Sequence, residues 1–236
     1  MSKVISNIKL GDGFYLMDTD AKENVEVGQF YMVRGWGEYP LLSRPISVFD
    51  INENGVRFLY KVVGKGTEIL ASLKGGDDVT LQGPYGKSFP MPEGNELTFV
   101  GGGVGIAPLY YAAKVFKKQN PDLKIKIYLG FTEEGKHEEL FKDLDAEIII
   151  KIGGFITDIV DYENDKLIYT CGPKIMMEKV YRNASAAGGE VYVSMEERMG
   201  CGVGACLSCT CKTTEGNKRV CKDGPVFKAE EVFFDE

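Results

Sequence analysis

The sequence predicts an antiparallel β-barrel, followed by a doubly wound α/β domain with a parallel sheet and by a cysteine-rich tail. Three observations predict this: short apolar runs separated by turns in residues 1–92, alternating strand and helix patterns in 93–196, and a Gly/Cys-rich stretch without either pattern in 197–236. The chain has 236 residues, and about 100–150 residues form one domain. We therefore expect two compact domains, divided at these boundaries, and a tail.

The barrel is predicted from runs rich in β-branched and aromatic residues, each bounded by Gly, Asp, Asn or Pro. These runs cover residues 4–10, 14–18, 29–35, 45–51, 56–63 and 77–84. Short strands at this spacing are typical of an antiparallel barrel or sandwich. A short helix is expected at residues 66–74, and the Pro/Gly-rich residues 89–94 mark the end of the domain.

The α/β domain is predicted from the change to a strand–helix–strand pattern. Expected strands cover residues 96–102, 124–131, 147–153, 166–172 and 190–196, and expected helices cover 106–119, 136–144, 155–162 and 173–188. Pro173 at a first helical position and Gly188 after a last turn fit the rules for helix ends. The pattern predicts a doubly wound sheet of about five parallel strands.

Composition limits the function and the location. Hydrophobic residues make up 44% and charged residues 27%, as in soluble globular proteins. The net charge of −7 gives no support to nucleic-acid binding. No apolar run approaches the roughly 20 residues of a membrane span, and the N-terminal stretch lacks the apolar centre of a signal peptide. We expect a cytoplasmic protein without a membrane or nucleic-acid partner, in which clustered thiols bind metal or carry out redox chemistry.

The tail carries the most specific motif. Cys201, Cys206 and Cys209 follow the spacing C-x4-C-x2-C, and Cys221 comes after eleven further residues. This is the plant-type ligand pattern of a [2Fe-2S] cluster. A four-thiolate zinc site and disulfides are the alternatives, although zinc sites usually contain two closely spaced cysteine pairs. The spacing therefore favours an iron–sulfur cluster.

The loop around these cysteines has the residues needed to curl tightly. Gly200, Gly202 and Gly204 permit unusual backbone dihedrals. We expect Cys221 on the next strand, after a hairpin at residues 214–218. Cys211 is surplus to the pattern, and alternation along a strand would turn it away from Cys209.

A one-electron cluster needs a partner redox group, and the barrel contains candidate residues for a flavin. Arg44 could neutralise a pyrophosphate, and Ser47 could reach a flavin ring nitrogen. Residues 64–67 begin a helix whose N–H groups would form an anion site. A structural role for the Arg-Pro-x-Ser sequence is the alternative.

Two glycine-containing turns of the α/β domain are candidate nucleotide sites. Residues 101–105 follow a strand and precede a helix, where dinucleotide pyrophosphates bind. Ile106 stands where the last glycine of G-x-G-x-x-G would be, and glycine is common in any such turn. A second turn at residues 171–173 ends another strand, at the edge where open α/β sheets bind ligands.

The motifs Arg-Pro-Ile-Ser, Gly-Gly-Gly-Val-Gly-Ile-Ala-Pro-Leu and Cys-Gly-Pro-Lys-Ile-Met-Met, in this order after a barrel, resemble the ferredoxin–NAD(P)H reductase superfamily. The cysteine-rich tail narrows the resemblance to the electron-transfer subunits of class 1B, NADH-linked, dihydroorotate dehydrogenase. The resemblance covers essentially the whole chain, and the tail is its specific part.

This resemblance implies three cofactor sites. FAD would contact Arg44, Pro45, Ile46, Ser47, Leu59, Tyr60, Lys61, Gly66 and Thr67. NAD(H) would be framed by Gly101, Gly102, Gly103, Val104, Gly105, Cys171, Gly172 and Pro173, and the [2Fe-2S] cluster would be held by Cys201, Cys206, Cys209 and Cys221. We expect substitution of Cys221 to remove the cluster and to leave FAD bound.

The resemblance also implies a role in pyrimidine biosynthesis. Electrons would pass from FMN in a catalytic dihydroorotate dehydrogenase subunit through the cluster and FAD to NAD+, in a heterotetramer with two copies of each subunit. Such a role requires no catalytic residue in this chain, and we interpret the sole histidine, His137, as structural.

Three features leave alternatives open. Many superfamily members have an aromatic residue where Ile46 stands, so Tyr60 is a candidate to cover the flavin ring. Glu133 and Glu134 would favour the ribose 2′-hydroxyl of NADH over the phosphate of NADPH, or they form a plain acidic loop. Cys201 differs from the aspartate common in the related NADH-dependent ferredoxin:NADP+ oxidoreductases and sulfide dehydrogenases, which are the rival assignment. A zinc-stabilised binding module is the alternative outside redox chemistry.

Overall fold

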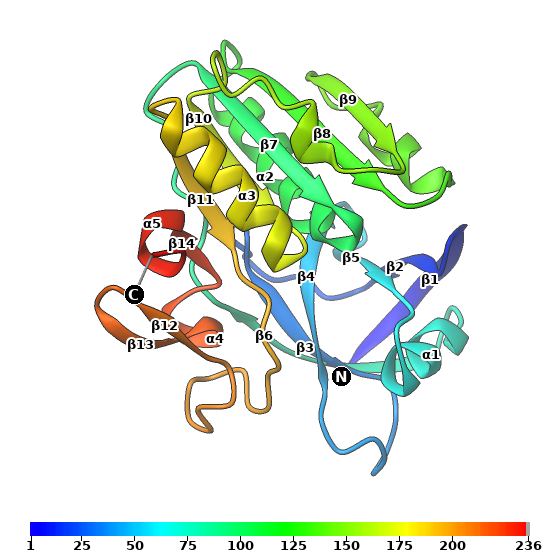
Figure 1. Cartoon of the computed structure of the whole chain (residues 1–236). Coiled ribbons are helices and arrows are strands. Elements are labelled where there is room, and N and C mark those ends of the chain that lie inside the picture. Colours follow the sequence, from blue (N-terminus) through cyan, green and yellow to red (C-terminus); the bar gives the residue numbers. More distant parts are fainter. Residues whose placement is uncertain (235–236) are drawn as a thin grey trace.

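The computed structural model describes residues 1–234, except for the side chains of residues 136–138 (Figure 1). Antiparallel strands close into a barrel in the order β1-β2-β5-β4-β3-β6, which confirms the predicted barrel. Its strands are β1 (Ser2–Gly11), β2 (Phe14–Thr19), β3 (Phe30–Arg34), β4 (Arg44–Ile51), β5 (Val56–Lys61) and β6 (Asp78–Tyr85). The predicted short helix is α1 (Lys65–Ser72), which lies between β5 and β6 in the chain.

Strand β3 contributes to two separate apolar cores. Tyr31 and Val33 pack in the core that includes the barrel interior, whereas Phe30 and Met32 pack in a second core. Alternate side chains of a strand point to opposite faces, which allows this division. We call the second core the tail core, because many of its residues come from the C-terminal part of the chain. Its members near the sites discussed below are Phe30, Met32, Met195, Met199, Cys209, Val220, Cys221 and Phe227.

The α/β part is a sheet in the order β14-β11-β10-β7-β8-β9. The strands are β7 (Glu96–Gly102), β8 (Lys124–Phe131), β9 (Glu147–Ile152), β10 (Leu167–Cys171), β11 (Glu190–Ser194) and β14 (Val226–Lys228). The first five are parallel to one another, as predicted, and β14 pairs antiparallel with β11. Helices α2 (Ile106–Gln119) and α3 (Lys174–Ala186) follow β7 and β10.

Two expected helices are shorter than the sequence pattern indicates. The segments at 136–144 and 155–162 contain only 3₁₀ helices, Lys136–Phe141 and Ile156–Asp158. Short segments rarely support α-helices because helix nucleation is unfavourable. The prediction about His137 concerns a side chain that lies outside the described residues.

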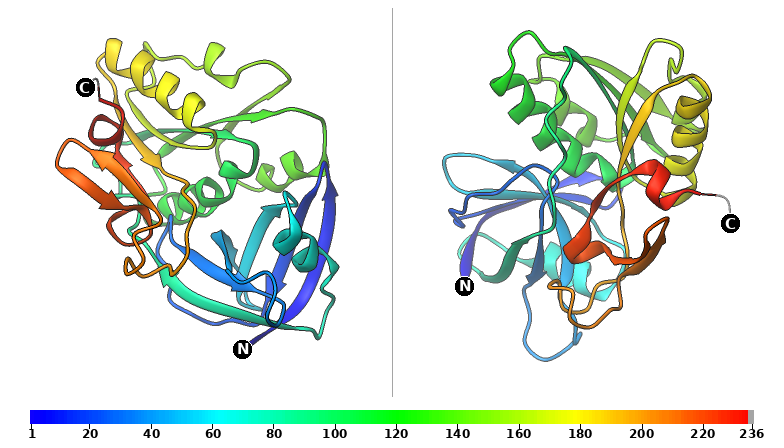
Figure 2. Two further views of the ribbon diagram at one scale, coloured as in Figure 1. Left: turned by 60° about the horizontal axis from the view of Figure 1, so that its bottom comes forward. Right: turned by 90° about the vertical axis from the view of Figure 1, so that its left-hand side faces the viewer.

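The tail lies on one side of the molecule, where it packs against both the barrel and the sheet (Figure 2). It contains the hairpin of β12 (Thr210–Thr213) and β13 (Gly216–Arg219), the one-turn helix α4 (Val220–Asp223), strand β14 and α5 (Ala229–Val232). Through β14 the tail completes one edge of the sheet. None of the helices in the described part of the chain has both the length and the apolar character of a membrane span.

Candidate functional site

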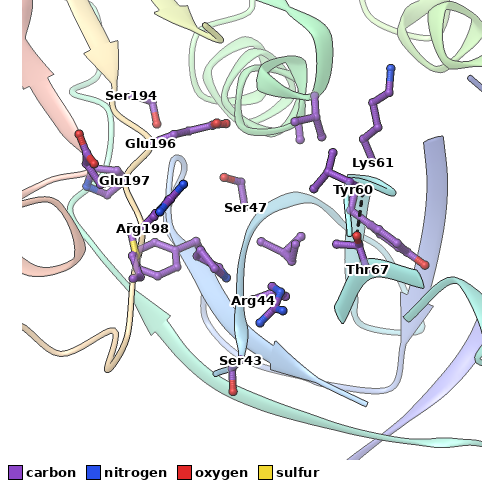
Figure 3. Close-up of a pocket in the computed structure, with 18 of the residues that line it drawn as sticks. Ser43, Arg44, Ser47, Tyr60, Lys61, Thr67, Ser194, Glu196, Glu197 and Arg198 are labelled. Carbon is purple, nitrogen blue, oxygen red and sulfur yellow. Dashed lines mark hydrogen bonds between the residues drawn. The ribbon is translucent and has the colours of Figure 1, made fainter. Parts of the chain in front are cut away.

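A pocket of about 770 Å³ lies between the barrel, the start of α2 and the segment after β11 (Figure 3). This volume falls within the usual range for sites of small molecules and cofactors. The sequence-predicted flavin residues that line it are Arg44, Pro45, Ile46, Ser47, Leu59, Tyr60, Lys61 and Thr67. The predicted nucleotide residue Val104 also lines the pocket. Strands β4 and β5 thus bring together the motif at residues 44–47 and the motif at residues 59–67, which are separated in the sequence.

One wall of the pocket consists of residues 194–199, which we call the bridging segment. Figure 3 shows Ser47 on the barrel side and Glu196 on the bridging segment, both directed into the pocket. Sequence reasoning missed this wall. The end of strand β11 was the sequence feature that could have identified this wall, because ligands of open α/β sheets bind beyond the carboxyl ends of the strands. Met199 is followed by Gly200 and Cys201, so the wall leads directly into the cysteine loop.

The guanidinium of Arg44 lies over the start of α1. A methyl group built on Gly66 would lie 2.6 Å from Arg44 Cζ, so a side chain there would displace the guanidinium. The Thr67 hydroxyl donates a hydrogen bond to the carbonyl of Gly64 (2.9 Å) and accepts one from the N–H of Val63 (2.9 Å). A fixed cation beside a helix N-terminus suits a diphosphate, which supports the predicted flavin site.

Tyr60 and Lys61 line the pocket, but their polar groups point elsewhere. The Tyr60 hydroxyl donates to Asn7 Oδ1 at 3.0 Å, and burial raises the pKa of this phenol. Lys61 Nζ lies 2.7 Å from a carboxylate oxygen of Asp12. Within the pocket, these residues therefore offer ring and backbone surface rather than a hydroxyl or an ammonium.

The two predicted nucleotide turns are in direct contact. Strands β7 and β10 pair in parallel, with Gly101 opposite Cys171. A methyl group on Gly105 would lie 2.5 Å from the carbonyl carbon of Cys171 and 2.6 Å from Cα of Gly172. A methyl group on Gly102 would lie 3.2 Å from Cδ of Pro173.

The remaining glycine of the first turn, Gly103, has a positive φ of 55° and open space around it. Val104 lies both in this turn and in the pocket wall, so the two turns form a frame next to the pocket. The Cys171 thiol within the frame is buried, and burial raises its pKa.

The cysteine loop curls through left-handed backbone conformations. Gly202 and Gly204 have φ values of 73° and 80°, and Leu207 has a φ of 60°. A residue with a side chain pays roughly 1–2 kcal/mol for this conformation, which indicates that the surrounding loop enforces it. The curl directs backbone N–H groups at sulfur: Gly204 donates to Cys221 Sγ (3.1 Å) and Ala205 donates to Cys201 Sγ (3.3 Å).

The predicted ligands are arranged as two pairs. Cys206 N–H donates to Cys201 Sγ at 3.4 Å, and Cys221 N–H donates to Cys209 Sγ at 3.4 Å. All six cysteines of the chain are free thiols, which argues against the disulfide alternative. In the described part of the chain, no three Cys, His, Asp or Glu side chains group closely enough to hold a single metal ion. Two thiolate pairs suit the two irons of a [2Fe-2S] cluster.

The two pairs lie in different environments. Cys209 and Cys221 are buried in the tail core, and burial raises the pKa of Cys221 to about 12. Cys206 is exposed, and hydrogen bonding from the Ser208 hydroxyl is the main cause that lowers its pKa to about 6. Cys206, with the half-buried Cys201 beside it, therefore marks the side of the loop that faces outward.

The prediction that Cys221 lies on a strand was wrong. Strand β13 ends at Arg219, and Cys221 lies in the one-turn helix α4. The Asp223 carboxylate accepts hydrogen bonds from the N–H of Arg219 (2.8 Å) and from its guanidinium (2.9 Å), which closes the turn. This turn places the Cys221 sulfur beside Gly204. The surplus Cys211 lies on β12 and packs half-buried against the tail core.

The comparison with protein families agrees with the motif in the tail. Residues 196–233 match the model described as the iron–sulfur cluster binding domain of dihydroorotate dehydrogenase B. The "Dihydroorotate dehydrogenase B (NAD(+)), electron transfer subunit" of Clostridium acetobutylicum is 42% identical over 246 residues, covering 100% of this chain and 98% of that protein. The protein of the same name from Clostridium perfringens is 40% identical and covers 98% and 97%.

Solved structures with the same fold include redox proteins. A chain from the structure titled "Insights into flavin-based electron bifurcation via the NADH-dependent reduced ferredoxin-NADP oxidoreductase structure" matches with a TM-score of 0.89 and 28% identity, over 98% of this chain and 89% of that one. The ferredoxin reductase of carbazole 1,9a-dioxygenase matches with a TM-score of 0.69 and 22% identity, over 80% and 65%. The latter similarity concerns the fold alone.

Proposed function

The chain belongs to the family of dihydroorotate dehydrogenase B electron transfer subunits, and from this membership we propose that it passes electrons between a catalytic partner subunit and NAD+ through a [2Fe-2S] cluster and FAD. The observation that carries the proposal is the bridging segment, which forms a wall of the pocket and continues into the cysteine loop. Bound flavin exchanges two electrons with a nicotinamide and single electrons with a cluster. The chain's own residues bind and position the groups.

We assign FAD to the pocket between the barrel and the bridging segment. Arg44 and the start of α1, including Gly66 and Thr67, would hold the diphosphate. The apolar surface of Pro45, Ile46 and Leu59 would pack on the ring system, with Ser47 offering a hydroxyl. Tyr60 and Lys61 complete this side of the pocket with ring and backbone surface.

We assign the cluster to Cys201, Cys206, Cys209 and Cys221. Backbone N–H groups stabilise the thiolate sulfurs, and burial of Cys209 and Cys221 keeps water away from one side of the site. Val203 and Leu207 on the same loop are 50% and 61% exposed. Exposed apolar side chains around a redox site suit the docking of a partner protein.

NAD(H) is assigned to the frame formed by the turns at residues 101–105 and 171–173. The turn before α2 presents N–H groups at a helix N-terminus, which suits a dinucleotide phosphate. Glu133 and Glu134 are exposed in the loop after β8, at the same edge of the sheet. Carboxylates there would repel the 2′-phosphate of NADPH. Replacing both with glutamine should raise the use of NADPH relative to NADH, and an unchanged ratio would make them a plain acidic loop.

The proposed partner is an FMN-containing dihydroorotate dehydrogenase catalytic subunit, with two copies of each subunit in a cytoplasmic complex. Co-expression with candidate catalytic subunits tests this assignment. We expect dihydroorotate-dependent reduction of NAD+ by the purified complex and a mass that matches a heterotetramer. If no catalytic subunit supports this reaction, the proposed function is wrong.

A second candidate is a subunit of an NADH-dependent ferredoxin:NADP+ oxidoreductase or of a sulfide dehydrogenase. The full-length structural match with 28% identity favours the former of these. Cys201 at the first ligand position, where the resemblance implies aspartate in that group, favours the dihydroorotate system. Reduction of ferredoxin without any effect of dihydroorotate would support the second candidate.

A further inference from the structure

The loop of residues 35–43 joins β3 to β4 (Figure 1). It contains the only tryptophan of the chain, Trp36. Two arginines contact this side chain: Arg34 Cζ and Arg44 Cζ each lie 5.4 Å from the centroid of the indole ring. A guanidinium at this distance is attracted by the electrons of an aromatic face. Arg44 is the residue assigned to the FAD diphosphate, so the indole contacts the cofactor site indirectly.

The structure holds the Trp36 ring in place from several sides. The indole Nε1–H donates to the carbonyl of Pro40 at 2.6 Å. Arg34 donates to backbone carbonyls around the loop, including those of Trp36 (3.1 Å) and Leu41 (2.7 Å). At the base of the loop, a methyl group on Gly35 would lie 2.7 Å from a methyl of Leu73, so the loop packs directly on the end of α1. The ring is therefore a rigid surface rather than a mobile side chain.

Arginine side chains are often held in place by an ion pair with a carboxylate, and Arg44 is held differently. Within the part of the chain that the structure describes, no carboxylate forms an ion pair with Arg44. Its guanidinium instead donates to the carbonyl of Leu42 and lies between the Trp36 ring and Gly66. These neutral contacts orient the cation without neutralising it. An arginine held in this way keeps its charge for an anionic ligand, and it loses less side-chain freedom when the ligand binds.

We propose that Trp36 is a positioning residue for the FAD site: its indole ring holds the Arg44 guanidinium at the start of α1, ready for the diphosphate. The inference rests on the proposed flavin function and adds a specificity element to it. Trp36 contributes to the binding of the diphosphate half of FAD, so it favours FAD over a flavin without phosphates. Riboflavin contains the same ring system without phosphates and is the appropriate probe.

The test is a double-mutant cycle on the full-length chain, with affinities from flavin fluorescence. Flavin-free protein is titrated with FAD and with riboflavin for wild type, Trp36→Leu, Arg44→Met and the double variant. We expect Trp36→Leu to weaken FAD binding about tenfold, in keeping with one lost cation–π contact and the added freedom of the arginine. Riboflavin affinity should not change, and the double variant should match Arg44→Met because the two residues act through one contact.

Two further variants control for damage to the loop. Trp36→Phe keeps an aromatic face and should retain most of the FAD affinity. Tyr39→Leu changes an exposed residue of the same loop and should bind FAD like wild type. Unchanged FAD affinity in Trp36→Leu, equal weakening of FAD and riboflavin, or additive losses in the double variant would each overturn the inference. If Arg44→Met leaves FAD affinity unchanged, the diphosphate assignment under the proposed function fails as well.

Discussion

Lys114 Nζ lies 2.7 Å and 2.9 Å from the two carboxylate oxygens of Asp50, and this ion pair joins helix α2 to barrel strand β4. Asp50 is 2% exposed, and the adjacent Phe49 ring stacks on Tyr110 with centroids 4.2 Å apart. Strand β4 also carries the flavin residues 44–47, and α2 begins at the nucleotide turn. The contact therefore fixes the two candidate cofactor sites relative to each other.

The first prediction concerns this ion pair. Lys114→Met leaves the buried Asp50 with the more distant Arg57, 3.4 Å away, as its ion-pair partner. Lys114 is 44% exposed and Arg57 remains as a partner, so loss of this charged hydrogen-bonded pair should lower the free energy of unfolding by about 2 kcal/mol. Urea unfolding measures the change, and Lys124→Met, at an exposed ion pair with Glu96, is the matched control. The exposed pair should contribute less than about 1 kcal/mol. Equal losses in both variants would contradict the role of Asp50.

The second prediction concerns the contact between the nucleotide turns. Gly105→Ala would place a methyl group 2.5 Å from the Cys171 carbonyl carbon, so the turns must separate. We expect the KM for NADH to rise at least about tenfold, with a smaller loss of FAD affinity because the adjacent Val104 lines the FAD pocket. Gly94→Ala is the control, since a methyl group there meets nothing within 4 Å. Normal NADH kinetics in Gly105→Ala would show that the frame does not bind the nucleotide.

The third prediction concerns the link between the cluster and the flavin. Cys221→Ser should remove the cluster, which iron and sulfide analysis measures. Met195 and Met199 of the bridging segment share the tail core with Cys221, so the pocket wall should loosen. We expect FAD to remain bound about tenfold more weakly. Cys211→Ser should keep both cofactors. Wild-type FAD affinity in Cys221→Ser would show that the wall is independent of the cysteine site.

Most of the fold follows from local patterns, whereas one wall of the site does not. Continuous apolar runs such as residues 30–33 predict a strand, and the apolar spacing of α2 predicts a helix. The bridging segment has no periodic pattern, because its place depends on how the chain leaves β11 and crosses to the barrel. Strand β14 is too short to be recognised and forms by pairing with β11. The turn at Cys221 depends on the interaction of Arg219 with Asp223, which strand propensity does not reveal.

The fourth prediction concerns the pH dependence of stability. Glu196 is an exposed residue, but partial desolvation by its surroundings raises the pKa of its carboxyl, because desolvation disfavours the charged form. The folded chain therefore binds the proton more tightly than the unfolded chain does. The stability that this proton provides is present below the ordinary carboxyl pKa and is lost as pH rises through the raised value.

Glu196→Gln should remove this pH dependence. The free energy of unfolding of the variant should therefore exceed that of wild type by more at mildly alkaline pH than at mildly acidic pH. Urea midpoints at the two pH values measure the effect. Glu197→Gln, one residue along the same segment, is the control. A gain that does not depend on pH, or an equal effect in the control, would argue against a desolvated carboxyl in the pocket.

The proposed electron path connects a nicotinamide site, a flavin and an iron–sulfur cluster within one chain. Anaerobic titration of the purified holoprotein with NADH tests it most directly, with flavin absorption and the electron paramagnetic resonance signal of the reduced cluster followed together. We predict that NADH bleaches the flavin band and that the signal of a reduced [2Fe-2S] cluster develops in the same protein. A cluster that stays oxidised while the flavin is reduced, or a colourless protein with stoichiometric zinc, would show that this electron path does not exist.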